Sequence, residues 1–354
     1  MDAIYLVGGK GTRLRPLTYT TVKPMVPIMN RPLLERKLGR AARSGIRRAI
    51  LSTGYKSDII ETYFSQHPIK GMQVLIKKEL SPLGTGGAIR NAAAGLSDDF
   101  FVFNADILEG IDLAKMARCH RQMHADVTIA VKRVEDVRSF GVIEQRDGYA
   151  HRFIEKPQAG ETSSHLINAG TYIFSPEVIS LIARNQAVSV ERDVFPLLLE
   201  RGKKIAVYPI RSYWRDIGNP EDYLRVHADI MKGLYRIPEV DYRSQQVYCN
   251  GIATTYQNDM MRGPVYIGKN VQIGPGAVIG PYACIGDNCH IPSGCRVGRS
   301  LLWENVHLGR NEQTFGSIVT PSCRIDGLED VFGDVKSSQI TDTAENVAAF
   351  LNIE

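Results

Sequence analysis

Short apolar runs alternate with longer amphipathic segments up to about Lys232. The runs at 3–7, 48–53, 72–76 and 100–104 predict buried strands, because each is rich in β-forming residues and ends at a polar or glycine-containing turn. Helices are predicted between them, at 33–44, from the cap residues Ser57 and Asp58 onward, and from Gly84 onward. This alternation is typical of a Rossmann-like α/β domain whose helices cover a mostly parallel sheet, and we expect it over residues 1–235.

From Val265 the pattern changes to a period of six residues. Six consecutive units place a small residue two positions before an aliphatic one, with the small residues at Val265, Val271, Ala277, Ala283, Cys289 and Cys295. Such a period predicts a parallel β-helix in which each unit forms one side of a triangular coil, with small residues inside the corners. We expect a linker at 236–264, this β-helix at 265–354, a further side at 306–309 and a short helix at 345–351.

Composition adds few constraints. The chain has 354 residues, 44% of them hydrophobic, and a formal net charge of +5, which is ordinary for a globular protein. Its densest basic run, from Arg36 to Arg48, predicts a solvated helix face rather than a nucleic-acid surface, because no aromatic residues interleave it. The opening apolar run is too short for a signal peptide or a membrane span, so we expect neither nucleic acid nor membrane as a partner.

Cysteine usage favours a reduced, cytoplasmic setting. None of the six cysteines forms a C-x-x-C pair. Cys284, Cys289 and Cys295 lie within the repeat, where they are expected to be small core residues.

A glycine loop follows the first predicted strand. Gly8, Gly9 and Gly11 let the backbone turn and bring its N–H groups close to a ligand, and Lys10, Arg13 and Arg15 add positive charge. Lys23 follows close behind. A strand, a glycine loop and cations together indicate a polyphosphate site, although a glycine-rich turn can also simply close a βα unit.

Two carboxylates occupy conspicuous positions. Asp106 follows the strand 100–104, and Asp216 lies in a predicted turn before the helix 221–231. Aspartate is also common in turns and at helix caps, which is the alternative interpretation of both residues. Beside a polyphosphate site, however, they form a natural pair of ligands for Mg²⁺, which proteins usually hold with one or two carboxylates plus substrate phosphates.

The string from Leu6 to Thr18 resembles the signature of the sugar-1-phosphate nucleotidyltransferases, and the resemblance extends over essentially the whole chain, including the left-handed hexapeptide β-helix. It implies Arg13, Lys23 and Asp106 as catalytic residues and Asp106 and Asp216 as metal ligands. The nucleotide-binding residues that it implies are Leu6, Gly8, Gly9, Gly11, Thr12, Arg13, Lys23, Gly84 and Thr85. The chain departs from the family at Ala105, where glycine is usual.

Three further motifs resemble those of the family's sugar-phosphate pocket. They are Glu155-Lys156-Pro157, Asn168-Ala169-Gly170 and the turn at Gly141. The resemblance implies that Lys156 pairs with the phosphate and that Glu155 and Asn168 contact the sugar. The expected substrates are therefore a nucleoside triphosphate and a sugar or cyclitol 1-phosphate.

The segment from Leu83 to Ala88 resembles that of mannose-1-phosphate guanylyltransferases, which favours GTP. Thymidylyl transfer to glucose 1-phosphate is the second hypothesis. A non-catalytic regulatory or scaffolding relative is a third, disfavoured because Arg13, Lys23, Asp106, Lys156 and Asp216 are all present. Acyl transfer by His290 or His307 is a fourth, for which the predicted β-helix is short. We expect a homo-oligomer, a dimer or a tetramer.

Overall fold

The structure is a computed structural model that describes residues 1–184, 186–242, 247–249 and 260–328. Contacts divide the chain into two compact units. The first unit comprises Met1–Gly11, Thr20–Met25 and Leu33–Asp216; the second comprises Thr12–Tyr19, Val26–Pro32 and the chain from Ile217 onward. The predicted domain limits at 235 and 264 stay predictions. Residues 243–246 and 250–259 of the predicted linker, and the predicted helix 345–351, lie outside the described residues.

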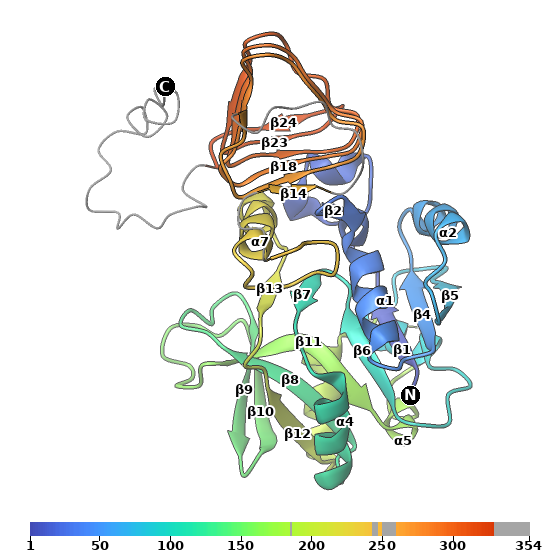
Figure 1. The fold of residues 1–354 in the computed structure, drawn as a ribbon. Coiled ribbons are helices and arrows are strands. Elements are labelled where there is room, and N and C mark those ends of the chain that lie inside the picture. The colour runs from blue at the N-terminus through green and yellow to red at the C-terminus, as the bar shows by residue number, and fades with distance from the viewer. Residues whose placement is uncertain (185, 243–246, 250–259, 329–354) are drawn as a thin grey trace. The chain divides into compact units, whose positions relative to one another are not determined.

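The first unit is built on a nine-stranded sheet (Figure 1). Its order is β5 (Gln73–Lys78), β4 (Arg48–Thr53), β1 (Ala3–Leu6), β6 (Phe100–Asn104), β11 (Leu166–Phe174), β8 (Val127–Arg133), β12 (Ile205–Pro209), β10 (Tyr149–Glu155) and β9 (Gly141–Arg146). The strands from β5 to β6 are parallel, as predicted. The other half is mixed, because β11 is antiparallel to both β6 and β8, and β10 is antiparallel to β12 and β9. The prediction of a mostly parallel sheet is therefore correct for one half only.

Alternating side chains of the central strands pack into two hydrophobic cores, one on each face of the sheet. Tyr5 and Phe103 pack with α1 (Leu33–Arg43), α2 (Ser57–Gln66) and α4 (Leu113–Gln122). Ile4 and Val102 pack on the other face with α3 (Gly84–Ala92), α5 (Pro176–Ile179) and α6 (Phe195–Glu200). This two-sided burial explains why β1 and β6 are continuous apolar runs.

Three local predictions need correction. Strand β5 alternates between exposed and half-buried residues because it lies at the edge of the sheet, so it is not a buried strand. Helix α2 begins one residue earlier than a Ser57–Asp58 cap would place it, after Lys56 in the left-handed region and without a side-chain cap. In α1, Arg36 and Lys37 are buried, so the basic run is not a fully solvated face.

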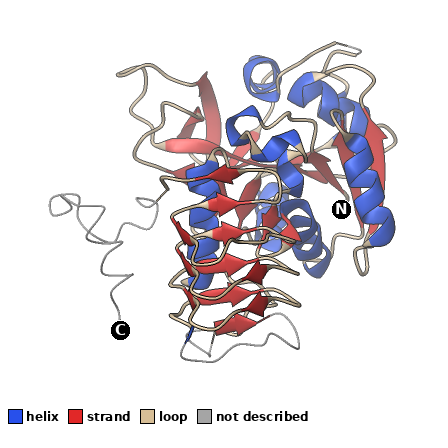
Figure 2. Cartoon of the chain, turned by 90° about the horizontal axis from the view of Figure 1, so that it is seen from above, coloured by secondary structure: helices blue, strands red, loops and turns tan. Residues whose placement is uncertain are grey.

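The second unit contains a stack of short parallel strands on three faces (Figure 2). One face holds β14 (Val247–Cys249), β15 (Val265–Ile267), β18 (Ala283–Ile285), β21 (Leu301–Leu302) and β23 (Ile318–Val319). The second holds β16 (Gln272–Ile273) and β19 (His290–Ile291), and the third holds β17 (Val278–Ile279), β20 (Arg296–Gly298) and β22 (Gln313–Phe315). We call this stack the coil. Its handedness stays a prediction.

Register explains both the period of six and its loss. Val265 pairs with Ala283, and Val278 with Arg296, so one turn of the coil takes 18 residues, or three sides of six. Cys284 then pairs with Leu301 and Arg296 with Gln313, at a spacing of 17. One residue is missing from these later turns, which is why the repeat blurs after Arg299.

Small and aliphatic residues fill the interior of the coil. Cys289 and Cys295 are buried in its core with Ile291 and Val297, as predicted, and burial raises the pKa of the Cys289 thiol to about 11. Cys284 is buried but lies outside this core cluster, with its Sγ 3.9 Å from Met29 Sδ. His290 and His307 are exposed.

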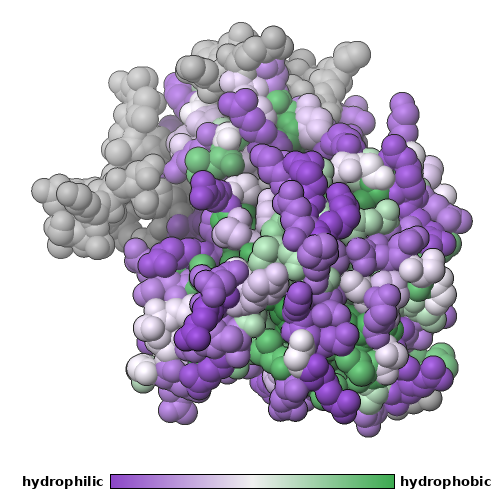
Figure 3. Space-filling view, turned by 90° about the horizontal axis from the view of Figure 1, so that it is seen from below, coloured by the Kyte–Doolittle hydropathy of each residue, from purple (hydrophilic) through white to green (hydrophobic). Residues whose placement is uncertain are grey.

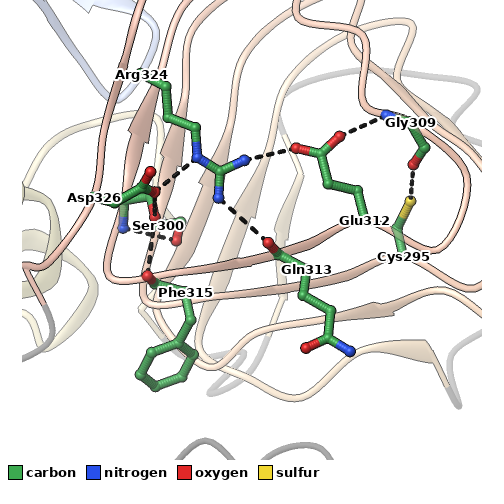
Figure 4. A network of polar contacts seen from close by, with 9 residues as sticks. Cys295, Ser300, Gly309, Glu312, Gln313, Phe315, Arg324 and Asp326 are labelled. Atoms are coloured by element: carbon green, nitrogen blue, oxygen red, sulfur yellow. Dashed lines mark hydrogen bonds and ion pairs between the residues drawn. The ribbon is translucent and has the colours of Figure 1, made fainter.

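Polar contacts connect the last turns of the coil with the strand that follows them (Figure 4). Arg324, in β24 (Arg324–Ile325), donates to Asp326 Oδ1 at 2.7 Å and to Glu312 Oε1 at 2.7 Å. The other carboxylate oxygen of Glu312 accepts the Gly309 N–H at 2.6 Å. These contacts link β24, which is antiparallel to β23, to the last turns of the coil.

Hydrophilic residues cover most of the face shown in Figure 3, with hydrophobic residues scattered among them. No helix among the described residues has the length and apolar character needed to cross a bilayer.

The close stacking of the coil yields a test of its packing. A Cβ added at Gly286 would overlap the backbone of Trp303 and Glu304 in the next turn, whereas one at Gly309 would meet only Glu312 Oε2 at 3.4 Å. Both glycines have ordinary φ values, so Gly→Ala changes the unfolded chain similarly at the two positions. We expect Gly286→Ala to lower the free energy of unfolding by about 1–3 kcal/mol relative to Gly309→Ala, measured by urea denaturation. Equal stabilities of the two variants would contradict the stacking described.

Candidate functional site

A cavity of about 590 Å³ lies at the carboxyl ends of the parallel strands of the first unit. Gly8 and Gly9 enter it after β1, Gly54 after β4, Glu79 after β5 and Asp106 after β6. Ligands bind at this edge in open α/β sheets, and the volume is in the range of small-molecule sites. Its wall is completed by Leu6, Val7, Lys10, Lys23, Pro24, Tyr55, Leu80, Ser81, Pro82, Gly84, Thr85, Ala88 and Asn104.

Most of the residues predicted to bind nucleotide meet in this cavity. Leu6, Gly8, Gly9, Lys23, Gly84 and Thr85 all line it, together with Asp106. Gly11, Thr12 and Arg13 do not appear in its lining. Thr12 and Arg13 lie in a short 3₁₀ helix (Thr12–Leu14) that groups with the second unit, and Arg13 is exposed. The predicted roles of these three residues therefore stay predictions.

A two-stranded ladder brings the two predicted carboxylates together. Strand β7 (Ile107–Glu109) starts directly after Asp106, and β13 (Trp214–Asp216) pairs antiparallel to it, with Asp216 opposite Ile107. Asp216 thus ends a strand, which corrects the predicted turn. The Lys23 ammonium, on a side chain that is 8% exposed, lies 2.7 Å from Asp106 Oδ2 and 3.3 Å from Asp216 Oδ1. A cation already bridges the pair.

The two carboxylates are of the ligand type that a divalent cation such as Mg²⁺ takes. Their oxygens face one positive charge at the edge of the cavity. Proteins usually hold Mg²⁺ with one or two carboxylates plus substrate phosphates. No cluster of three or more acidic, histidine or cysteine ligands is found among the described residues. Water or substrate oxygens would therefore complete the coordination.

The residues predicted for the sugar phosphate also come together in the first unit. Glu155 pairs with Gly141 across β10 and β9. A Cβ added at Gly141 would lie 2.9 Å from Glu155 Oε2 and 3.9 Å from the Asn168 Cβ, so the three positions form one cluster. Lys156 follows directly, exposed and in the left-handed region at φ 53°, with its N–H bonded to the Phe140 carbonyl.

Glu191 is part of this cluster and was missed in the sequence. Burial raises the pKa of the Glu155 carboxyl, and the negative charge of Glu191 raises it further. Glu191 lies in a π-helical turn (Val190–Val194) and accepts a hydrogen bond from the Thr85 hydroxyl at 3.1 Å. Thr85 lines the cavity, so a direct hydrogen bond connects the predicted nucleotide and sugar clusters. Nothing in the local sequence pattern marks Glu191 as close to Glu155.

Gly170 joins the sugar motif to the carboxylates. Asn168, Ala169 and Gly170 lie inside β11, at an irregularity of its pairing with β8. Gly170 has φ 70°, and a Cβ there would be 2.5 Å from Ile107 Cδ1 and 2.7 Å from Asn104 Nδ2. Trp214 Nε1 donates to the neighbouring Ala169 carbonyl at 2.9 Å. The motif therefore packs directly on β7 and β13.

Two further residues of the cavity were missed. Glu79 accepts hydrogen bonds from the Ser52 hydroxyl at 3.0 Å and the Leu83 N–H at 3.2 Å, which fix its carboxylate in the wall. Asn104 lines the cavity with a buried Oδ1 that has no hydrogen-bond partner in the described part of the chain. Buried polar atoms usually have a hydrogen-bond partner, so this one is an exception in the wall of the cavity. The position of each residue at the end of a strand was the signal that could have found them.

The family model described as nucleotidyl transferase matches residues 2–233, and the model described as GMPPB C-terminal domain matches residues 261–346. The chain belongs to the nucleotidyl transferase family.

Known relatives agree with this assignment. The chain is 42% identical to a mannose-1-phosphate guanylyltransferase of Mycobacterium tuberculosis over 77% of its own length and 76% of that protein's. It is 38% identical to the mannose-1-phosphate guanylyltransferase catalytic subunit beta of Danio rerio, covering 63% of both chains. The crystal structure of HddC from Yersinia pseudotuberculosis complexed with GMP-PN matches with a TM-score of 0.56 and 32% identity, over 64% of this chain and 97% of that one.

The raised pKa of Glu155 predicts a pH-dependent change in stability. Ionising this carboxyl costs more in the folded chain than in the unfolded chain, where its pKa is 4.5. It therefore subtracts stability above its folded pKa and nothing below 4.5. We expect Glu155→Gln to gain stability relative to the wild type at neutral pH, with the difference shrinking as the pH falls toward 4.5.

The measurement is chemical denaturation between pH 5 and pH 8. Glu200→Gln removes the same charge from an exposed position and is the matched control. A stability difference for Glu155→Gln that is as flat with pH as that of the control would contradict the assigned burial and the Glu155–Glu191 repulsion.

Proposed function

We propose that the protein transfers a nucleotidyl group from GTP to a sugar 1-phosphate, with mannose 1-phosphate as the first candidate, and releases pyrophosphate. The observation that carries the proposal is the Asp106–Lys23–Asp216 contact at the edge of the cavity formed by the glycine loop. The names of the relatives and the GMP-PN complex of HddC support guanine as the base. The chain spans only 63% of the length of the Danio rerio relative. The identity of the sugar is therefore a proposal.

Charge determines what this reaction requires. The attacking phosphate oxygen is already anionic, so neither a general base nor a covalent intermediate is needed. The barrier lies in bringing two anions together, since two like unit charges 4 Å apart repel by roughly 4 kcal/mol at an effective dielectric near 20. Positioned cations are therefore expected to provide most of the catalysis.

The cations of the site can be assigned to separate tasks. Asp106 and Asp216 would hold Mg²⁺, which when bound would neutralise charge on the phosphates. Lys23 now contacts both carboxylates and lines the cavity, so its ammonium is within the same site to bind a phosphate oxygen. Lys156, beside Glu155, is proposed to pair with the phosphate of the sugar. Arg13 keeps its proposed role at the triphosphate on the strength of the loop motif.

Glu79 is proposed as the residue that recognises guanine. The Watson–Crick edge of guanine presents N1–H and N2–H as adjacent donors, and a carboxylate can accept both. Ser52 and Leu83 occupy only part of the acceptor capacity of Glu79, since each carboxylate oxygen accepts more than one hydrogen bond. Adenine offers no such pair of donors. Thymine and uracil offer a single one, which makes dTTP the weaker candidate.

The sugar is expected to bind among Gly141, Glu155 and Asn168. An ionised Glu155 and the Asn168 amide can bind hydroxyl groups, which sugars and cyclitols both present.

The second unit is proposed to be a left-handed β-helix that supports a homo-oligomer, a dimer or a tetramer. The cytoplasmic setting is supported by Cys119, Cys284, Cys289, Cys295 and Cys323, which are free thiols.

A nucleotide panel tests the reaction and the base together. We expect pyrophosphate release from GTP and mannose 1-phosphate to require Mg²⁺ and to exceed release from ATP, UTP, CTP or dTTP. Inosine triphosphate lacks the 2-amino group, so Glu79→Gln should narrow the GTP-to-ITP preference by about tenfold, the size of one charge-assisted hydrogen bond. Metal-independent turnover would refute the proposed mechanism. If Glu79→Gln lowered the rate of pyrophosphate release equally with GTP and with ITP, Glu79 would have a structural role instead.

Asp106→Asn tests the carboxylate pair. The change keeps the shape of the side chain and one acceptor oxygen, but it removes the charge that faces Lys23. We expect kcat to fall by at least about a hundredfold, the scale of losing one preorganised charge contact in a transition state. Steady-state rates at saturating Mg²⁺ measure it, with circular dichroism to verify the fold. A rate close to that of the wild type would place Asp106 outside the reacting centre.

A further inference from the structure

A second buried charge pair lies behind the site and has no part in the proposed chemistry. Lys37 in α1 is 5% exposed, and Glu109 in β7 is 6% exposed. Their Nζ and Oε2 atoms are 2.6 Å apart. Desolvating two charges costs about as much as their attraction returns, so a pair of well-packed apolar residues would serve stability equally well. Stability alone therefore does not account for this pair.

Lys37 makes another contact that does point to the site. Its Nζ also donates to the Ile107 carbonyl at 2.6 Å. Ile107 directly follows Asp106 and lies opposite Asp216 in the β7–β13 ladder. One buried ammonium thus fixes both ends of β7, at Ile107 through the backbone and at Glu109 through the side chain.

The position of Lys37 is itself well defined. Its Nζ lies 5.6 Å from the ring centroid of Phe103, which stacks on Tyr5 in the adjacent strand. Phe103 is the residue before Asn104 at the end of β6, so Lys37 links α1 to β6 and β7 together. The ladder is short, and its pairing with β13 is the connection that sets Asp216 beside Asp106.

We propose that Lys37, together with Glu109, is a positioning residue that holds β7 so that Asp106 and Asp216 face the same cation. This inference rests on the proposed function, in which those two carboxylates bind the metal ion. It assigns to the buried pair a role in metal affinity, although neither residue touches the substrate.

The test is the double variant Lys37→Met/Glu109→Gln, which removes both charges and leaves no unpaired buried ion. Mn²⁺ binding to the full-length protein, followed by electron paramagnetic resonance, should weaken by about tenfold, the lower end of the effect of losing an outer-shell partner. High Mg²⁺ should restore much of kcat, because an affinity defect is overcome by concentration.

Arg40→Met is the matched control. Arg40 lies one turn further along α1 and donates to the Ile111 carbonyl at 2.7 Å, beyond the ladder. It should leave Mn²⁺ affinity unchanged, whatever it does to the melting temperature.

The outcomes distinguish the positioning role of Lys37 and Glu109 from the metal site itself. Unchanged Mn²⁺ affinity in the double variant, with binding by the wild type, would overturn the positioning role alone. Equal weakening by Arg40→Met would also overturn it, because any loosening of α1 would then suffice. A wild type that binds no Mn²⁺ would overturn the metal site and the positioning role with it, whereas pyrophosphate release in the nucleotide panel tests the transfer reaction separately.

Discussion

The first unit depends on one electrostatic constraint: Asp106 and Asp216, far apart in the sequence, must lie within reach of the same positive charge. The β7–β13 ladder satisfies it by placing Asp216 opposite the residue that follows Asp106, and Lys23 compensates the two negative charges. Strand β6 supplies Asp106 from the centre of the sheet, and the parallel strands beside it supply the cavity wall at the same edge. The strand order thus helps to bring acids, an ammonium and a glycine loop to one place, which is the proposed phosphate site.

Several charged residues surround Asp106 and Asp216 and affect one another. Lys23 lies between the carboxylates, while the Lys37–Glu109 pair lies buried behind the same ladder. On the other side, Glu155 and Glu191 are close enough for the charge of one to raise the pKa of the other, which costs stability in the absence of a ligand. Sites that bind polar ligands commonly keep such unfavourable groups, because a ligand can supply the missing hydrogen bonds. The Thr85–Glu191 hydrogen bond means that the two proposed substrate clusters are not independent.

Much of this arrangement was predictable, and the exceptions have physical causes. Strands β1, β4 and β6 are buried on both faces and so appear as apolar runs, and the residues after β1 and β6 enter the cavity as strand polarity requires. The period of six predicted the coil until one residue was lost from each later turn. The burial of Lys37 could not be predicted, because a basic residue on a helix looks solvated unless its partner, here Glu109, is known. Glu191 and Glu79 depend likewise on contacts between distant segments. The antiparallel β11 has no pattern that separates it from a parallel strand.

Gly170 limits how this protein could change its substrate. The residue lies within the motif proposed to contact the sugar. A side chain at this position would nevertheless overlap Asn104 and Ile107, which end β6 and begin β7 on either side of Asp106. A mutation there cannot alter sugar contacts without also displacing β7. Asn168 shares part of this requirement, because its Oδ1 accepts the Gly170 N–H at 3.0 Å. Divergence toward a new acceptor is therefore closed at the glycine and constrained at Asn168, so evolutionary change in acceptor choice should be concentrated at Glu155, outside the Asn168–Gly170 motif.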